Sequence, residues 1–94
     1  MSKTRAHIFI EGHVHGVYFR DTTRRRALAL GVTGWVRNLI DGRVEAVFEG
    51  EEDAVQRMVR FAREGPPRAL VTHVDVEYAE YTGAFDTFSV RYTR

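Results

Sequence analysis

The order of hydrophobic patterns along the 94 residues constrains the fold of this chain more than any other feature of its sequence. Residues 5–11 alternate apolar and polar side chains, which is the two-residue period of a strand with one buried face. Residues 51–64 instead carry apolar side chains at helical spacing, with acidic residues in the first turn. Both periods within so short a chain predict a single domain, residues 1–94, in which helices pack on a sheet. The predicted core positions are Ala6, Ile8 and Ile10 in the strand and Ala54, Val55, Met58, Val59, Phe61 and Ala62 in the helix.

Residues 20–30 form the other predicted helix. Asp21 or Thr22 can cap its first turn, and Gly31 can end it in the left-handed conformation that glycine adopts readily. The run Arg24-Arg25-Arg26 is spread around this helix and is expected to face solvent. Its core side is predicted from Phe19, Thr23, Ala27 and Leu30.

Two β-rich runs, residues 32–39 and 43–49, lie between the helices and are predicted to form a hairpin. They are joined across Asp41-Gly42, a dipeptide that readily adopts the positive φ angles of a tight turn. Residues 74–78 also alternate, and they give a fourth strand after the second helix.

The predicted order is therefore strand, helix, strand, strand, helix, strand. This βαββαβ order is the split βαβ pattern of α+β, ferredoxin-like folds, an antiparallel sheet with both helices on one face. Residues 87–92 place Phe88, Val90 and Tyr92 on one side and are predicted to add an edge strand.

Composition excludes several classes of function. The chain has no cysteine, so it lacks disulfides, thiolate catalysis and Cys-based zinc sites. Its net charge of +1 provides no global basic field for nonspecific binding of nucleic acid. The first residues lack the apolar segment of a signal peptide, and no apolar run approaches the length of a membrane span. We therefore expect a cytoplasmic monomer with a small-molecule partner and no contact with membranes.

A segment bracketed by Gly12 and Gly16 connects the first strand to the first helix and brings Arg20 to the helix start. Glycine lets backbone N–H groups turn toward an anion, a helix N-terminus adds positive potential, and a guanidinium fits phosphate oxygens. Arg20 could instead face solvent or pair with a nearby carboxylate, here Asp21. The two glycines and the strand-loop-helix context favour a phosphate site.

Asn38 stands near the end of a predicted strand, just before the hairpin turn. Asparagine commonly ends a strand by bonding its own backbone, and on the residues alone this is the simpler interpretation. The functional interpretation is that a fixed carboxamide orients a water molecule.

His13 and His15 are two residues apart, so both imidazoles could point the same way in extended chain. Catalytic zinc usually has three protein ligands, and only Glu11 is a nearby oxygen donor, so we predict no metal site. His15 is instead expected to flank the anion pocket.

Trp35 and the aromatic residues of the last strands could stack on bases, but their alternating spacing is also that of a core face. No segment carries the glycine-aromatic signature of an RNA-recognition strand. We therefore expect core packing and no nucleic-acid partner.

Four segments of this chain resemble the acylphosphatase family in order and spacing, across nearly its whole length. The resemblance implies a ferredoxin-like fold and cofactor-independent hydrolysis of acyl phosphates to a carboxylate and inorganic phosphate, with phosphate also acting as a competitive inhibitor. The segments are Gly12-His13-Val14-His15-Gly16-Val17-Tyr18-Phe19-Arg20, Gly34-Trp35-Val36-Arg37-Asn38, Asp41-Gly42-Arg43-Val44-Glu45 and Gly65-Pro66-Pro67.

The resemblance also implies roles for individual residues. Arg20 matches the phosphate-binding arginine and Asn38 the asparagine that positions the attacking water. His15 departs from the pattern, because members of the family frequently have glutamine there. Similar motifs occur in regulatory domains, so a noncatalytic anion-binding module and, less favoured, an RNA-binding ferredoxin-like domain remain alternatives. The matching phosphate cradle is the backbone of His15, Gly16, Val17, Tyr18 and Phe19.

Overall fold

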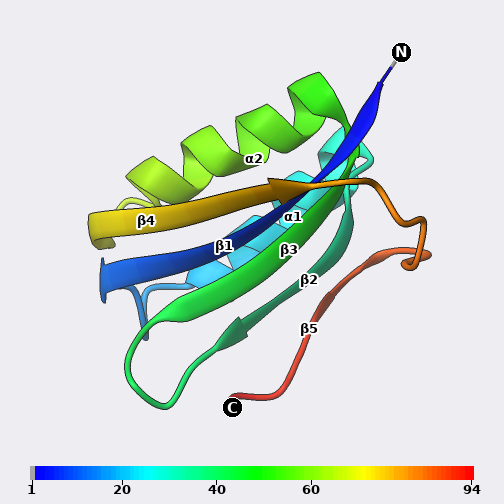
Figure 1. The fold of residues 1–94 in the computed structure, drawn as a ribbon. Coiled ribbons are helices and arrows are strands. Elements are labelled where there is room, and N and C mark those ends of the chain that lie inside the picture. Colours follow the sequence, from blue (N-terminus) through cyan, green and yellow to red (C-terminus); the bar gives the residue numbers. More distant parts are fainter. Residues whose placement is uncertain (1) are drawn as a thin grey trace.

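The structure, a computed structural model, describes residues 2–94 and confirms the predicted order of elements. Figure 1 shows both helices on one face of a five-stranded sheet, whose other face carries no helix. None of the helices in the described part of the chain is long and apolar enough to cross a membrane. The elements are β1 (Lys3–His13), α1 (Phe19–Leu30), β2 (Thr33–Asn38), β3 (Val44–Glu51), α2 (Glu52–Glu64), β4 (Leu70–Ala79) and β5 (Phe88–Val90).

The strands lie in the order β4-β1-β3-β2-β5. The first four pair antiparallel, as the sequence predicts, and the predicted edge strand is β5. It pairs parallel with β2, which makes the whole sheet mixed. Beyond β5 the chain continues along β2: the Arg91 N–H donates to the Val36 carbonyl at 2.9 Å, and the Arg94 N–H donates to the Asn38 carbonyl at 3.1 Å.

The core lies between the sheet and the helices. All the core positions predicted for β1 and α2 are buried, and α1 contributes Phe19, Thr23 and Ala27. On β5, Phe88 stacks on Phe48 with 5.8 Å between ring centroids. Burying each large apolar side chain stabilises the fold by about 1.5–3 kcal/mol. The packed core therefore fixes the positions of the strand ends and of the start of α1.

The predicted capping of α1 by Asp21 or Thr22 is wrong. The helix begins earlier, at Phe19, and no side chain caps it. Tyr18 precedes it in the left-handed conformation, with φ 62°, and its carbonyl accepts the Thr22 N–H at 3.0 Å. The backbone turn, and not a side chain, starts the helix. The first N–H groups of α1, next to the preceding loop, therefore have no side-chain acceptor from a helix cap.

Trp35 is buried, at 7% exposure, but outside the main core. The guanidinium groups of Arg37 and Arg91 both lie over its ring, with their carbon atoms 4.7 and 4.6 Å from the ring centroid. Among the aromatic residues of the last strands, core packing is confirmed for Phe88 and wrong for Tyr78 and Tyr92, which are exposed. Alternation alone did not reveal that β4 is an edge strand, or that Tyr92 lies beyond the end of β5.

Candidate active site

The loop between β1 and α1 is held by apolar side chains that point into the core. Val14, Val17 and Phe19 are almost completely buried. Between them, Gly16 and Tyr18 have φ angles of 71° and 62°. A residue other than glycine in this conformation costs on the order of 1–3 kcal/mol, so Tyr18 is held there by its buried neighbours. The loop therefore has one defined shape.

This loop keeps its backbone donors available. No backbone N–H of residues 15–20 donates a hydrogen bond to another group within residues 2–94. The last of these N–H groups belong to the first turn of α1, where the helix dipole adds positive potential. Such a row of donors at a helix start fits an anion.

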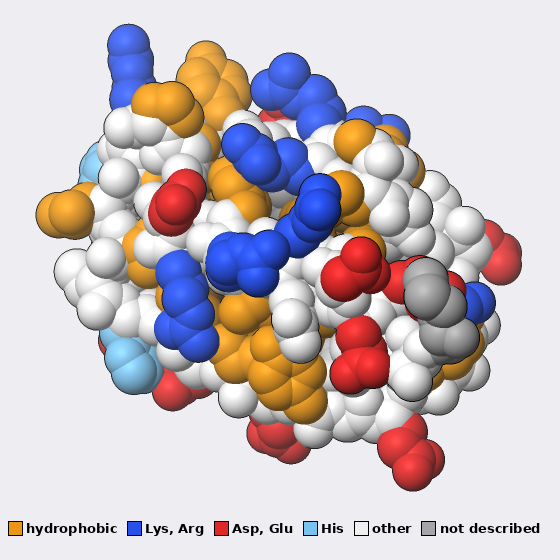
Figure 2. Space-filling view, turned by 90° about the horizontal axis from the view of Figure 1, so that it is seen from above, with side chains coloured by type: hydrophobic (Ala, Val, Ile, Leu, Met, Phe, Trp, Pro, Cys, Tyr) orange, Lys and Arg blue, Asp and Glu red, His pale blue; other side chains and the backbone are white. Residues whose placement is uncertain are grey.

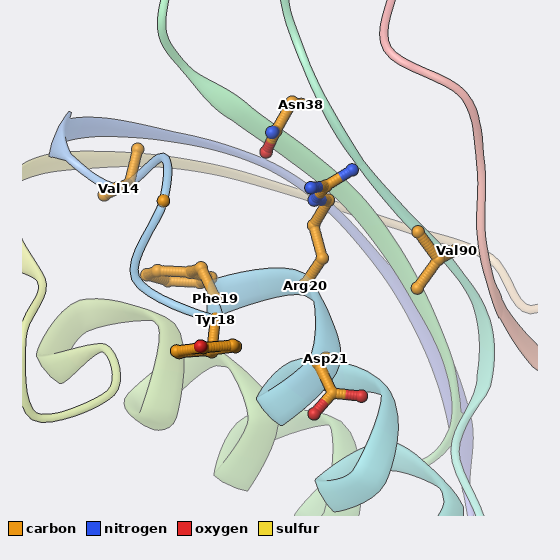
Figure 3. A pocket seen from close by; sticks show the side chains of 8 residues that line it. Val14, Tyr18, Phe19, Arg20, Asp21, Asn38 and Val90 are labelled. Atoms are coloured by element: carbon orange, nitrogen blue, oxygen red, sulfur yellow. The ribbon is translucent and has the colours of Figure 1, made fainter.

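A pocket of about 510 Å³ opens between this loop and the end of β2. Figure 3 shows the side chains of Arg20, from α1, and Asn38, from β2, extending toward one another across it. The pocket is lined by Val14, Gly16, Tyr18, Phe19, Arg20, Asp21, Asn38 and Val90.

Arg20 has no ion pair within residues 2–94. The simpler interpretation, that it pairs with Asp21, is wrong. The Asp21 carboxylate binds Arg25 instead, at 2.9 Å and one helical turn further on. The guanidinium of Arg20 therefore extends into the pocket with its donors unused by carboxylates of the described chain.

Asn38 carries a buried polar atom without a partner. Its side-chain oxygen, Oδ1, is buried and accepts no hydrogen bond within residues 2–94. It therefore does not end the strand by bonding its own backbone, as the simpler interpretation expects. An unsatisfied buried polar atom costs about 1–3 kcal/mol, so one that faces a pocket indicates a bound water or ligand.

The predicted cradle residues divide into two groups. Gly16, Tyr18 and Phe19 line the pocket, whereas the side chains of His15 and Val17 do not. The His15 imidazole bonds the Arg43 carbonyl instead, with 2.9 Å between Nε2 and the oxygen. Contact between the backbone of these residues and an anion stays a prediction.

Sequence reasoning missed three lining residues, Val14, Asp21 and Val90. Val14 lies inside the glycine-bracketed segment, so its position was within reach of the motif. Val90 lines the pocket because β5 pairs with β2, and no local sequence pattern predicts that pairing.

The His15 imidazole bonds the Arg43 carbonyl, and His13 is exposed at the end of β1. Another group in the described chain, Glu11, His73 and Asp75, brings its possible ligand atoms within 4.8 Å of one another. All three residues are exposed and outside the pocket, and His73 already bonds Asp75 at 2.9 Å. This cluster has no connection to the candidate site.

The hairpin loop after Asn38 is fixed by a local ion pair. The Asp41 carboxylate accepts the backbone N–H of Arg43 at 3.1 Å and its guanidinium Nε–H at 2.9 Å. The side-chain and backbone hydrogen bonds from Arg43 hold the pKa of Asp41 below its ordinary value. The loop is therefore ordered by its own side chains as well as by the strands.

Arginine side chains are frequent on the exposed surface of the helices, where acidic side chains also lie. Figure 2 shows Lys and Arg side chains gathered on the face seen from above Figure 1, where α2 lies. As predicted, Arg24, Arg25 and Arg26 are exposed, and Arg26 covers the Phe61 ring at 4.6 Å. Electrostatic attraction of anions by these arginines, an effect that salt screens, stays a prediction.

Comparison with known proteins identifies the family. The acylphosphatase family model matches residues 6–90. Over 98% of its length the chain is 53% identical to an acylphosphatase of Pelotomaculum thermopropionicum and 59% identical to one of Haloarcula marismortui, and it covers 100% of each. A solved acylphosphatase structure from Coxiella burnetii matches with a TM-score of 0.90 at 39% identity, covering 96% of this chain and 94% of that chain. The chain therefore belongs to the acylphosphatase family of enzymes.

Proposed function

We propose that this chain hydrolyses the carboxyl-phosphate bond of acyl phosphates, giving a carboxylate and inorganic phosphate. The observation that carries the proposal is the buried, unpartnered Oδ1 of Asn38 beside a pocket that also receives Arg20. Arg20 and the backbone of residues 15–19 bind the phosphoryl group, and Asn38 orients the attacking water.

Binding of the phosphoryl group follows from the donors around the pocket. The guanidinium of Arg20 offers forked donors without a competing carboxylate partner in the described chain, and the loop offers unpaired N–H groups. In phosphoryl transfer, catalysis comes mainly from positioning and from stabilising charge on the phosphoryl oxygens. Preorganised donors of this kind supply both effects.

The leaving group needs no acid from the protein. An acyl phosphate expels a carboxylate, whose conjugate acid has a pKa of about 4, so it departs unprotonated at neutral pH. Among the described residues, the pocket lining includes a single carboxylate, Asp21, which is consistent with a reaction that needs no pair of acidic side chains.

The water must approach in line with the departing carboxylate. Its oxygen forms a bond to phosphorus while the bond from phosphorus to the acyl oxygen breaks, and the acyl oxygen keeps the electron pair. Asn38 accepts a hydrogen bond from this water through Oδ1, and its place on a strand end limits the directions of attack. Asparagine is not a base, so the water's proton passes to a phosphate oxygen.

The assay is hydrolysis of benzoyl phosphate by the purified chain, with inorganic phosphate as a competitive inhibitor. The decisive variant is Asn38→Ala, which removes the water's orienter but leaves Arg20 and the loop. We expect turnover to fall at least about 100-fold while the inhibition constant for phosphate changes less than threefold.

The alternatives give different results. A noncatalytic anion-binding module binds phosphate but leaves benzoyl phosphate intact, and an RNA-binding domain shifts labelled RNA at physiological salt. Full activity of Asn38→Ala contradicts the role of Asn38, and no turnover by the wild-type chain contradicts the proposed function.

A further inference from the structure

The two halves of the candidate site come from separate parts of the chain. Arg20 follows the loop between β1 and α1, and Asn38 is the last residue of β2. Sheet pairing holds Asn38 on two sides: it lies opposite Val44 of β3, and its carbonyl accepts the Arg94 N–H. Val44 also pairs with Ile10 of β1, so the sheet connects Asn38 to the strand that leads into the loop, and the position of the loop beyond β1 depends on further contacts.

One side-chain hydrogen bond in the described chain joins the two halves. It runs from the imidazole Nε2 of His15 to the Arg43 carbonyl, over 2.9 Å. The same carbonyl accepts the N–H of Leu39, the residue after Asn38, at 2.8 Å. The His15 ring therefore contacts the closing pair of the hairpin that begins directly after Asn38.

Arg43 is a firm attachment point. Its backbone N–H and guanidinium are bound to Asp41, and the guanidinium lies over the Phe9 ring, 4.8 Å from its centroid. A hydrogen bond to this carbonyl therefore fixes the loop that contains His15 relative to the whole hairpin. A carbonyl only accepts, so His15 Nε2 carries the proton and donates.

We infer that His15 is a positioning residue, which sets the distance between the bound phosphoryl group and the water held by Asn38. Its imidazole is half-buried and does not line the pocket, so it acts through the hairpin and not on the substrate. The inference rests on the proposed function, and it assigns the side chain of His15 a role different from that of its backbone. Misplacement of reacting groups by 1 Å can cost on the order of 100-fold in rate. Loss of the hydrogen bond from His15 to the Arg43 carbonyl is therefore expected to lower turnover.

The test compares His15→Ala with His15→Gln, whose amide N–H can donate to the same carbonyl. The matched control is His13→Ala, which removes an exposed imidazole of the same segment that has no hydrogen bond in the described chain. We expect His15→Ala to lower kcat for benzoyl phosphate at least about 10-fold, with the phosphate inhibition constant changed less than threefold. His15→Gln should stay within about threefold of the wild-type kcat, and His13→Ala should match the wild type.

A second readout needs no turnover. The side-chain amide resonances of Asn38, followed by NMR in the presence of phosphate, should shift in His15→Ala and return toward their wild-type positions in His15→Gln. A structural role alone would lower the melting temperature without this pattern. Wild-type kcat in His15→Ala, no recovery in His15→Gln, or unmoved Asn38 resonances would each overturn the inference. An inactive wild-type chain contradicts the proposed function instead, and the NMR comparison then decides the role of His15 by itself.

Discussion

The Asp21 carboxylate binds the Arg25 guanidinium at 2.9 Å, although Arg20 is its direct neighbour in the sequence. Positions four apart lie on the same side of a helix, whereas adjacent positions diverge by about 100°. The Asp21 carboxylate therefore pairs with Arg25 and not with Arg20, although Asp21 also lines the pocket. Arg20 keeps its guanidinium for the pocket, which it enters from the first turn of α1.

Arg20→Ala should weaken phosphate binding and turnover together. The expected loss in kcat/KM corresponds to about 2–4 kcal/mol, the range for a lost donor to a developing oxyanion. Arg20→Lys should recover part of this loss, because it restores the charge but not the forked donors. Steady-state kinetics with phosphate inhibition measure both quantities, and Arg24→Ala, at an exposed position of the same helix without an ion pair in the described chain, is the control. An unchanged phosphate inhibition constant in Arg20→Ala would show that Arg20 does not contact the anion.

Asn38→Asp should weaken inhibition by phosphate more than Asn38→Ala does. The carboxylate has nearly the shape of the amide, but at neutral pH it is charged and faces Arg20 across the pocket. It should pair with that guanidinium and repel a phosphate dianion. We therefore expect weaker phosphate inhibition in Asn38→Asp and nearly unchanged inhibition in Asn38→Ala. Equal inhibition constants in the two variants would contradict the shared pocket.

Much of this fold could be predicted from local patterns. The stripe of α2 and the alternation of β1 each match a single period, and every core residue expected there is buried. Gly31 ends α1 in the left-handed conformation, at φ 71°, as its position predicts. These features depend on neighbouring residues, which a sequence displays directly.

The errors concern contacts between distant segments. The parallel pairing of β5 with β2, and with it the place of Val90 in the pocket, depends on where the chain returns after β4. The predicted capping of α1 is wrong because Tyr18, a residue that rarely adopts positive φ, turns the chain there. Backbone strain of this kind, here beside the candidate site, is imposed by tertiary packing, and residue propensities do not predict it. The cytoplasmic location and the monomeric state stay predictions.

Removal of metal ions should leave activity unchanged. The proposed reaction uses N–H donors, a guanidinium and an amide, and its leaving group needs no Lewis acid to depart. Purified chain dialysed against EDTA should therefore hydrolyse benzoyl phosphate at the same rate as untreated chain. Loss of activity that returns on adding a divalent cation would contradict the prediction that the site needs no metal.

Gly34→Ala should destabilise the sheet strongly. An added Cβ would lie 1.9 Å from the Val47 carbonyl oxygen, and φ at this position is 134°. The backbone carbonyl cannot move aside without disturbing the pairing of β2 with β3, so we expect a loss of at least about 2 kcal/mol in unfolding free energy. Gly42→Ala is the control: its φ is 100°, but a Cβ there meets nothing within 4 Å. Urea unfolding should show a clearly smaller loss in Gly42→Ala, and equal losses would contradict the role of the close contact.

Glu49 holds the connection between β4 and β5 onto the helix-free face of the sheet. Its carboxylate is fully buried and accepts hydrogen bonds from the Arg5 guanidinium at 2.8 Å, the Thr82 hydroxyl at 2.7 Å and the Gly83 N–H at 3.0 Å. Burial alone would raise the pKa of Glu49, but the hydrogen bonds from Thr82, Arg5 and Gly83 together lower it below the ordinary 4.5. The charged form is therefore the one that the fold stabilises.

Glu49→Gln should consequently lower stability in a pH-dependent way. The amide keeps one acceptor but turns an N–H₂ toward groups that donate, so we expect a loss of about 2–4 kcal/mol at neutral pH. Because the folded pKa is depressed, the wild-type advantage is complete above the unfolded pKa and declines as the pH falls through the lower folded value. Urea unfolding at about pH 7 and about pH 3.5 should therefore show a large difference between the two proteins at the first pH and a smaller one at the second. Glu77→Gln, at an exposed position without an ion pair in the described chain, should show neither effect. A difference that stays constant down to about pH 3 would mean that the charge of Glu49 is not what fixes the connection.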